Sequence, residues 1–267
     1  MNTRRIAAIG LRQFFLMRGS VTRTVPLFVW VAIDMVLWGF ITKYLNTVAS
    51  PGFDFVPVLL GAVLLWDFFT RVMQGVTMAF FEDVWSRNFL NIFASPLTIT
   101  EYLAGLVLTS IATSAVGLVV MVVLAATAFG LSFLSYGAAL VGLVLVLFLF
   151  GIALGVAACA GVLRFGPSAE WFVWPIPGLI SPFAGVFYPI ATLPRWMQAI
   201  AAVLPPSHVF EGLRAVVMGG AVAPARIGIA GALAVAYLLG ACWLFTRVYR
   251  DALRTGLIAR YSAESLS

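Results

Sequence analysis

The chain has 267 residues, of which 63% are hydrophobic and 10% are charged, and its formal net charge is +6. Soluble domains carry about 25% charged residues, so this composition excludes an ordinary soluble protein and indicates an integral membrane protein. The basic residues flank apolar segments, so the charge reflects membrane topology and contact with anionic lipid headgroups, and no nucleic-acid partner is needed to explain it.

A bilayer core of about 30 Å is crossed by roughly 20 apolar residues in helical conformation. Runs such as 140–149 are apolar at every position, whereas the strands of a membrane barrel alternate in polarity. We therefore expect an all-α membrane protein with one transmembrane domain over 25–249. Six crossings are predicted: 25–42, 55–81, 103–130, 134–163, 171–193 and 227–246.

Arginines gather before the first predicted crossing and after the last one. The positive-inside rule then places both termini in the cytoplasm, in agreement with an even number of crossings. Residues 1–24 alternate apolar and basic positions, which favours an amphipathic helix on the inner membrane surface. Residues 250–267 are expected to form a cytoplasmic tail. The first apolar run begins only at Val25 and is too long for a typical signal peptide, so we expect it to be retained.

Polar side chains interrupt the first two predicted crossings. The first contains Asp34, and the second contains Asp67, Arg71 and Gln74. A spacing of four places Asp67 and Arg71 on one helical face, where they can pair. An unpaired charge at this depth costs about 2.5–3.5 kcal/mol, so such groups face protein or a watery path. Two interpretations stay open: a neutralised pair that locks helices together, or direct contact with a substrate.

The segment 82–101, between the second and third crossings, mixes charged and large apolar residues in a pattern typical of a short amphipathic helix. Pro96 ends that helix, and Thr98 with Glu101 has the form of a capping box, so the third crossing should begin near Ile99. Because solvated loops rarely expose so many large apolar residues, a docking surface is favoured over an ordinary connection. The residues assigned to it are Glu82, Asp83, Arg87, Asn88, Phe89, Leu90 and Phe93.

Four prolines interrupt the fifth predicted crossing: Pro175, Pro177, Pro182 and Pro189. Its helix is therefore expected to be kinked or broken. Such a segment either borders a transport path or is relieved by neighbouring helices. Residues 194–220 then predict two amphipathic helices, too short to cross, that form a re-entrant hairpin at the outer face, with Ser207 at the start of the second.

Motifs for nucleotide hydrolysis, zinc proteases and serine hydrolases are absent from the sequence. Cys159 and Cys242 form no CxxC pair, and His208 has no acidic or cysteine neighbours in a ligand pattern. We therefore expect neither an enzyme nor a cofactor or metal site in this chain.

Two stretches resemble the membrane subunit, or permease, of ABC transporters of the ABC-2 exporter type. The first, 82–105, has a charged start, an apolar middle, a small-Pro-Leu turn and then Glu-Tyr-x-x-Gly. The second, 181–220, has Gly-Val-Phe-Tyr-Pro, Leu-Pro, an amphipathic helix, Pro and a final Leu-Arg. The resemblance covers essentially the whole chain. In that family the first stretch is the coupling helix and the second forms the outer re-entrant helices.

This resemblance implies a half-transporter in a bacterial inner membrane. It would pair with a second copy of itself and with two ATP-binding subunits that hold ATP and Mg²⁺. It would export an amphipathic, lipid, polysaccharide or drug-like substrate. The residues at outer motif positions are Phe187, Tyr188, Pro189, Pro194, Glu211 and Arg214.

A different class of transporter is the alternative. An ion- or proton-coupled carrier would use Asp34, Asp67 and Arg71 at membrane depth. Such carriers often show duplicated halves, and the sequence has no convincing internal repeat. A membrane-embedded enzyme would need clustered nucleophiles, metal ligands or carboxylates, and no such cluster appears in the sequence.

Overall fold

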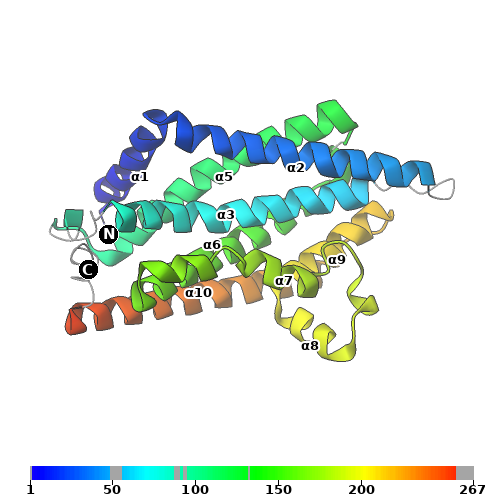
Figure 1. The fold of residues 1–267 in the computed structure, drawn as a ribbon. Coiled ribbons are helices and arrows are strands. Elements are labelled where there is room, and N and C mark those ends of the chain that lie inside the picture. The colour runs from blue at the N-terminus through cyan, green and yellow to red at the C-terminus, as the bar shows by residue number, and fades with distance from the viewer. Residues whose placement is uncertain (1, 49–55, 87–90, 93–94, 132, 257–267) are drawn as a thin grey trace.

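The computed structural model describes residues 2–48, 56–86, 91–92, 95–131 and 133–256, without the side chains of 22–24, 26–28 and 134–135. Within these residues the chain is helical and contains no strand, which confirms the all-α class. The first helix, α1 (Thr3–Arg18), and the C-terminal end of the last, α10 (Pro224–Thr255), lie at one end of an elongated bundle (Figure 1). The short helix α8 (Arg195–Val203) lies toward the opposite end.

Among the described residues, four helical segments are long and apolar enough to cross a membrane. They are Val56–Trp85, Ile99–Phe129, Ala139–Phe165 and Pro224–Thr255. The first consists of a π-helical turn, η1 (Val56–Leu60), followed by α3 (Gly61–Trp85), and the next two are α5 and α6. These four correspond to the second, third, fourth and sixth predicted crossings. The helix α2 (Val21–Val48) coincides with the first predicted crossing, and its 28 residues are long enough to span.

The fifth predicted crossing is broken, as its prolines indicate. It consists of η3 (Pro167–Phe172), α7 (Ile176–Ala184) and η4 (Ile190–Thr192), so no single helix covers 171–193. The nine residues of α7 extend about 14 Å, which is less than half of a bilayer core. Gly185, with φ of 61°, ends α7 in the left-handed conformation that glycine adopts at little cost.

Two short helices follow, as predicted, and they are α8 and α9 (Pro205–Val217). The expected role of Ser207 is wrong, because Leu204 occupies the cap position and Pro205 begins the helix. Proline suits the first helical turn, where its missing N–H would have no partner. The Ser207 hydroxyl instead donates to the carbonyl oxygens of Ala201 and Leu204, which fastens α9 to the end of α8.

The core is built around α3, which packs against both α5 and α6. In the most apolar stretch of α3, 56% of the residues are buried, against 17% in α10. The α5 and α6 helices approach α3 closely because small residues lie at both helix–helix contacts. A Cβ added at Gly155 of α6 would lie 2.8 Å from Val76 Cβ, and one added at Gly75 would lie 2.8 Å from Ser110 Oγ of α5. The Ser110 hydroxyl donates to the Val72 carbonyl at 2.8 Å.

Candidate functional site

The segment between α3 and α5 is the candidate site, and its second boundary is the predicted capping box. Thr98 Oγ1 accepts from the Glu101 N–H at 3.3 Å, and Glu101 Oε2 accepts from the Thr98 N–H at 3.1 Å. The pair satisfies two backbone donors that the first turn of α5 leaves open. The predicted capping box is confirmed, and α5 begins at Ile99.

Glu101 also holds the start of α1. Its Oε1 accepts from the Asn2 N–H at 2.7 Å, and Arg5 Nη1 donates to its Oε2 at 3.4 Å. Only 4% of the Glu101 side chain is exposed. One carboxylate therefore caps α5 and binds two groups of α1, so the two helix starts are fixed to each other.

Asp83 makes a second attachment to α1 at the end of α3. Its side chain is completely buried, and its Oδ1 lies 2.5 Å from Arg12 Nη2. The Tyr102 hydroxyl donates to Asp83 Oδ2 at 2.8 Å. The segment 86–98 is thus preceded by one carboxylate and followed by another, and α1 binds both.

Apolar contact supports these polar attachments. Ile9 of α1 is buried against Gly105 of α5, where an added Cβ would lie 2.5 Å from Ile9 Cβ. The Gln13 amide, also buried, donates to the Ala79 carbonyl of α3 at 3.4 Å. Because α1 packs against α5 and its Arg12 and Gln13 side chains bind α3, the three helices are joined next to the segment 86–98.

The residues predicted for the docking surface divide into two groups. Asp83 is internal, and Glu82 is half-buried. Asn91 and Ile92 are helical, and residues 87–90 and 93–94 of the predicted amphipathic helix lie outside the described residues. The other five predicted contacts lie outside the described residues: Arg87, Asn88, Phe89, Leu90 and Phe93.

A further contact joins the end of α3 to the turn after α6. The Trp85 indole N–H donates to Glu170 Oε2 at 2.7 Å, and Glu170 lies in η3. Arg5, Arg12, Tyr102 and Glu170 were not predicted as partners of this site. Only Tyr102 stood within the motif that carries the family resemblance, so local sequence offered one signal for these contacts.

The structure brings the predicted intramembrane charges together. Asp34 of α2 lies within electrostatic range of Asp67 and Arg71 of α3, and Gln74 is half-buried one turn further along. The side chain of Arg71 lies along α5, since a Cβ added at Gly117 would be 3.3 Å from Arg71 Cδ. Among the described residues, Asp67 Oδ2 is buried without a hydrogen-bond partner.

The predicted outer residues gather around Glu211. Its Oε1 accepts from the Ile190 N–H at 3.0 Å and from Arg214 Nη2 at 2.8 Å, and its Oε2 lies 3.8 Å from Arg226 Nη1. Burial opposes ionisation of Glu211, but these hydrogen bonds and charges outweigh it, so the pKa of Glu211 lies below its ordinary value. Arg214 also donates to the Val186 carbonyl at 3.4 Å, which joins α9 to the segment after α7.

The other outer residues connect this region to α2. The Phe187 ring stacks on Trp38 of α2, with centroids 5.0 Å apart, and the Tyr188 hydroxyl donates to the Pro182 carbonyl at 2.8 Å. Pro189 precedes η4, and Pro194 precedes α8. Trp38 and Arg226 belong to this cluster and were not predicted.

Within the described residues, no group of three or more His, Cys, Asp or Glu side chains is arranged to hold a metal ion. Comparison with known families identifies residues 6–218 as matching the model described as ABC-2 type transporter. This range begins within α1 and extends to the end of α9, so it contains both the segment between α3 and α5 and the cluster around Glu211. No match was found among curated proteins.

Proposed function

This chain belongs to the ABC-2 type transporter family, and we propose that it is the permease half of an ATP-driven exporter. As a family member it is a multi-pass membrane component of a transporter and has no catalytic role itself. In the proposed assembly, two copies enclose the transport path and two separate ATP-binding subunits dock on 82–101. ATP and Mg²⁺ bind to those subunits.

The attachment of α1 to both sides of the docking segment supports this proposal. Asp83 and Glu101 each bind α1, so a force on 86–98 reaches α1, α3 and α5 together. ATP-driven closure of the docked subunits would displace this unit and change its packing against α6 and α2. A coupled machine needs such a difference in contacts between two states.

The proposed topology follows from docking of the ATP-binding subunits in the cytoplasm. The docking segment and both termini lie in the cytoplasm, and α8 and α9 lie at the outer face of a bacterial inner membrane. In this arrangement Asp83 orients the docking segment from inside the protein, while Arg87, Asn88, Phe89, Leu90 and Phe93 supply the contact surface.

The outer cluster has a proposed role as a gate. Phe187, Tyr188, Pro189 and Pro194 join α7 to α8, and the Glu211–Arg214 pair holds that connection against α9. Movement of α2 would reach it through the Trp38–Phe187 stack. The path for an amphipathic, lipid, polysaccharide or drug-like substrate would then run between the two copies, beside this cluster.

Copurification tests the docking step. Replacing two apolar residues by acids, Phe89→Asp/Phe93→Asp, should abolish recovery of the ATP-binding subunit while the protein still inserts in the membrane. The matched control is Phe165→Asp/Phe172→Asp, which makes the same change at exposed positions near the inner end of α6. Undiminished recovery with the first variant would contradict docking at this segment.

Transport in vesicles tests the energy source. Export that requires ATP and the copurifying subunit supports the proposal. Transport by the purified permease alone under a proton gradient would instead support the carrier that uses Asp34, Asp67 and Arg71.

Labelling tests the topology. Ser86→Cys should react with a membrane-impermeant reagent only after lysis, and Ala221→Cys should react in intact cells. The reverse result would overturn the orientation.

A further inference from the structure

The C-terminal half of α10 changes its exposed surface from apolar to aromatic to basic. Leu239 is 66% exposed and Trp243 is 61% exposed, and Arg247 follows at the same spacing of four, so the three lie along one stripe. Tryptophan favours the membrane interface, and arginine favours the cytoplasmic headgroup layer. The stripe therefore follows the order of a phospholipid, with apolar residues at the level of the acyl chains and arginine at the level of the headgroup.

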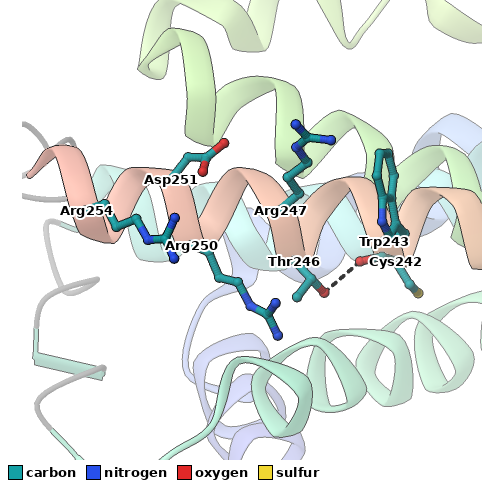
Figure 2. Close-up of a pocket in the computed structure, with 7 residues that line it drawn as sticks. All are labelled: Cys242, Trp243, Thr246, Arg247, Arg250, Asp251 and Arg254. Atoms are coloured by element: carbon teal, nitrogen blue, oxygen red, sulfur yellow. Dashed lines mark hydrogen bonds between the residues drawn. The ribbon is translucent and has the colours of Figure 1, made fainter.

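A basic groove occupies the end of this stripe. Its volume is about 600 Å³, and its lining includes Trp243, Thr246, Arg247, Arg250, Asp251 and Arg254. Figure 2 shows Arg247 and Asp251 on one side of α10, with Arg250 projecting from the other. The Arg247 guanidinium lies 5.4 Å from the centre of the Trp243 ring.

The charges of the groove are unbalanced. Three guanidinium groups face one carboxylate there, that of Asp251. Over the part of the chain that the structure describes, no carboxylate lies within ion-pair distance of Arg247, Arg250 or Arg254. Guanidinium groups bind phosphate oxygens through paired N–H donors, so an anion with a phosphate group fits this lining.

An apolar groove adjoins the basic one. It has a volume of about 380 Å³ and lies between α6 and α10, where Ala153, Ala157 and Gly240 contribute to its lining with Leu244. Gly240, Leu244, Arg247 and Asp251 follow one another at spacings of four, three and four, so the helix face that lines the apolar groove continues into the Arg247–Asp251 side of the basic groove. A free phosphate would fill only the basic groove.

We propose that α10 binds an anionic phospholipid of the inner leaflet. Its phosphate binds Arg250 and Arg254, Arg247 adds a third positive charge from the adjoining side of α10, and one acyl chain lies in the groove between α6 and α10. Trp243 marks the boundary between the two parts. This site is separate from the docking segment and does not depend on the direction of transport.

Lipid retention by the purified full-length protein, counted by native mass spectrometry, tests this site. We expect dioleoyl phosphatidylglycerol to be retained in preference to dioleoyl phosphatidylcholine. Each arginine near a membrane surface changes the affinity for anionic lipid about fivefold, so Arg250→Gln/Arg254→Gln should weaken phosphatidylglycerol binding roughly 25-fold. The same variant should leave phosphatidylcholine binding unchanged.

A charge-matched control separates a site from general attraction. Arg4→Gln/Arg18→Gln removes the same charge from exposed positions of α1 and should leave phosphatidylglycerol retention within twofold. An equal loss in both variants would overturn the proposal, since it would mean that only net charge matters. Preserved retention in Arg250→Gln/Arg254→Gln would overturn it as well.

The apolar groove gives a second, independent test. A Cβ added at Gly240 meets no atom within 4 Å, so Gly240→Leu should fold and fill the groove. We expect it to reduce retention of phosphatidylglycerol. Unchanged retention of phosphatidylglycerol by this variant would contradict binding of an acyl chain in the apolar groove. Glycerol 3-phosphate competes for the headgroup alone, and competition as strong as that of the intact lipid would assign the groove to a free phosphate compound.

Discussion

Asp83 and Arg12 illustrate how much a single buried carboxylate depends on its cation. Asp83 is fully buried, whereas 28% of the Arg12 side chain is exposed. Burying an ion pair gains little by itself, but removing one partner leaves an uncompensated charge in a medium of low dielectric constant. The Tyr102 hydrogen bond alone does not supply the missing positive charge.

The first prediction concerns this pair. Arg12→Met should lower the free energy of unfolding by about 3 kcal/mol, because it leaves Asp83 without its cation. Adding Asp83→Asn to the same protein should recover most of that loss. Thermal and denaturant unfolding of wild type, Arg12→Met, Asp83→Asn and the double variant measures the coupling between the two residues. Arg18→Met, exposed on the same helix, is the control, and an equal effect there would contradict a specific role for Arg12.

The second prediction concerns Glu211. Its pKa is lower in the folded protein than in the unfolded chain, so its contribution to stability is present above the unfolded pKa and is lost as pH falls through the folded pKa. Wild-type protein should therefore lose stability on acidification more steeply than Glu211→Gln, which has no carboxylate to protonate. Unfolding midpoints measured from neutral pH to well below about pH 4, the ordinary pKa range of glutamate, provide the comparison. Parallel curves would contradict the assignment.

At the scale of the element, glycine positions set how closely the helices approach. Gly151 and Gly155 of α6 form a G-x-x-x-G pattern that faces α3, and such small residues let membrane helices approach closely where hydrophobic driving force is weak. The Met73 carbonyl oxygen lies 2.9 Å from the Cβ position of Gly155, so the obstacle includes backbone that cannot rotate away.

The third prediction follows from this contact. Gly155→Leu should destabilise the protein by about 1–3 kcal/mol, because overpacking forces α6 away from α3. Gly161→Leu is the matched control on the same helix, since its added Cβ meets no atom within 4 Å. Unfolding in detergent compares the two. Equal stability of both variants would show that α6 can shift without cost.

The sequence predicted helix boundaries correctly where they depend on residues close together in the chain. Thr98 and Glu101 predicted the start of α5, because a capping box involves residues only three apart. The prolines predicted the break in the fifth crossing. Ser207 was misassigned because prolines beside it fit the first turn better.

The site was less predictable than the elements. The attachments of α1 join residues far apart in sequence, such as Arg12 with Asp83 and Asn2 with Glu101. The arginines of α1 were interpreted as topology signals, and their spacing does not identify the carboxylate with which each one pairs. Packing between α1, α3 and α5 decides those pairings.

For the whole molecule, the intramembrane charges limit how α2 and α3 can be arranged. Asp34, Asp67 and Arg71 bring two potential negative charges and one positive charge to a region where each unpaired charge costs about 2.5–3.5 kcal/mol. Arg71 lies within electrostatic range of both carboxylates. Its loss should therefore affect assembly of the entire membrane domain.

The fourth prediction follows from counting these charges. Arg71→Gln leaves two carboxylates without their arginine and should reduce the amount of folded protein in the membrane. Asp67→Asn leaves Asp34 with Arg71 and should fold at least as well as wild type, and the double variant should recover part of the loss of Arg71→Gln. Size-exclusion profiles of fluorescent fusions measure folding. If folded Asp67→Asn also supports ATP-dependent export, the cluster is a structural lock between helices. Export lost in a folded Asp67→Asn protein would instead place Asp67 on the transport path.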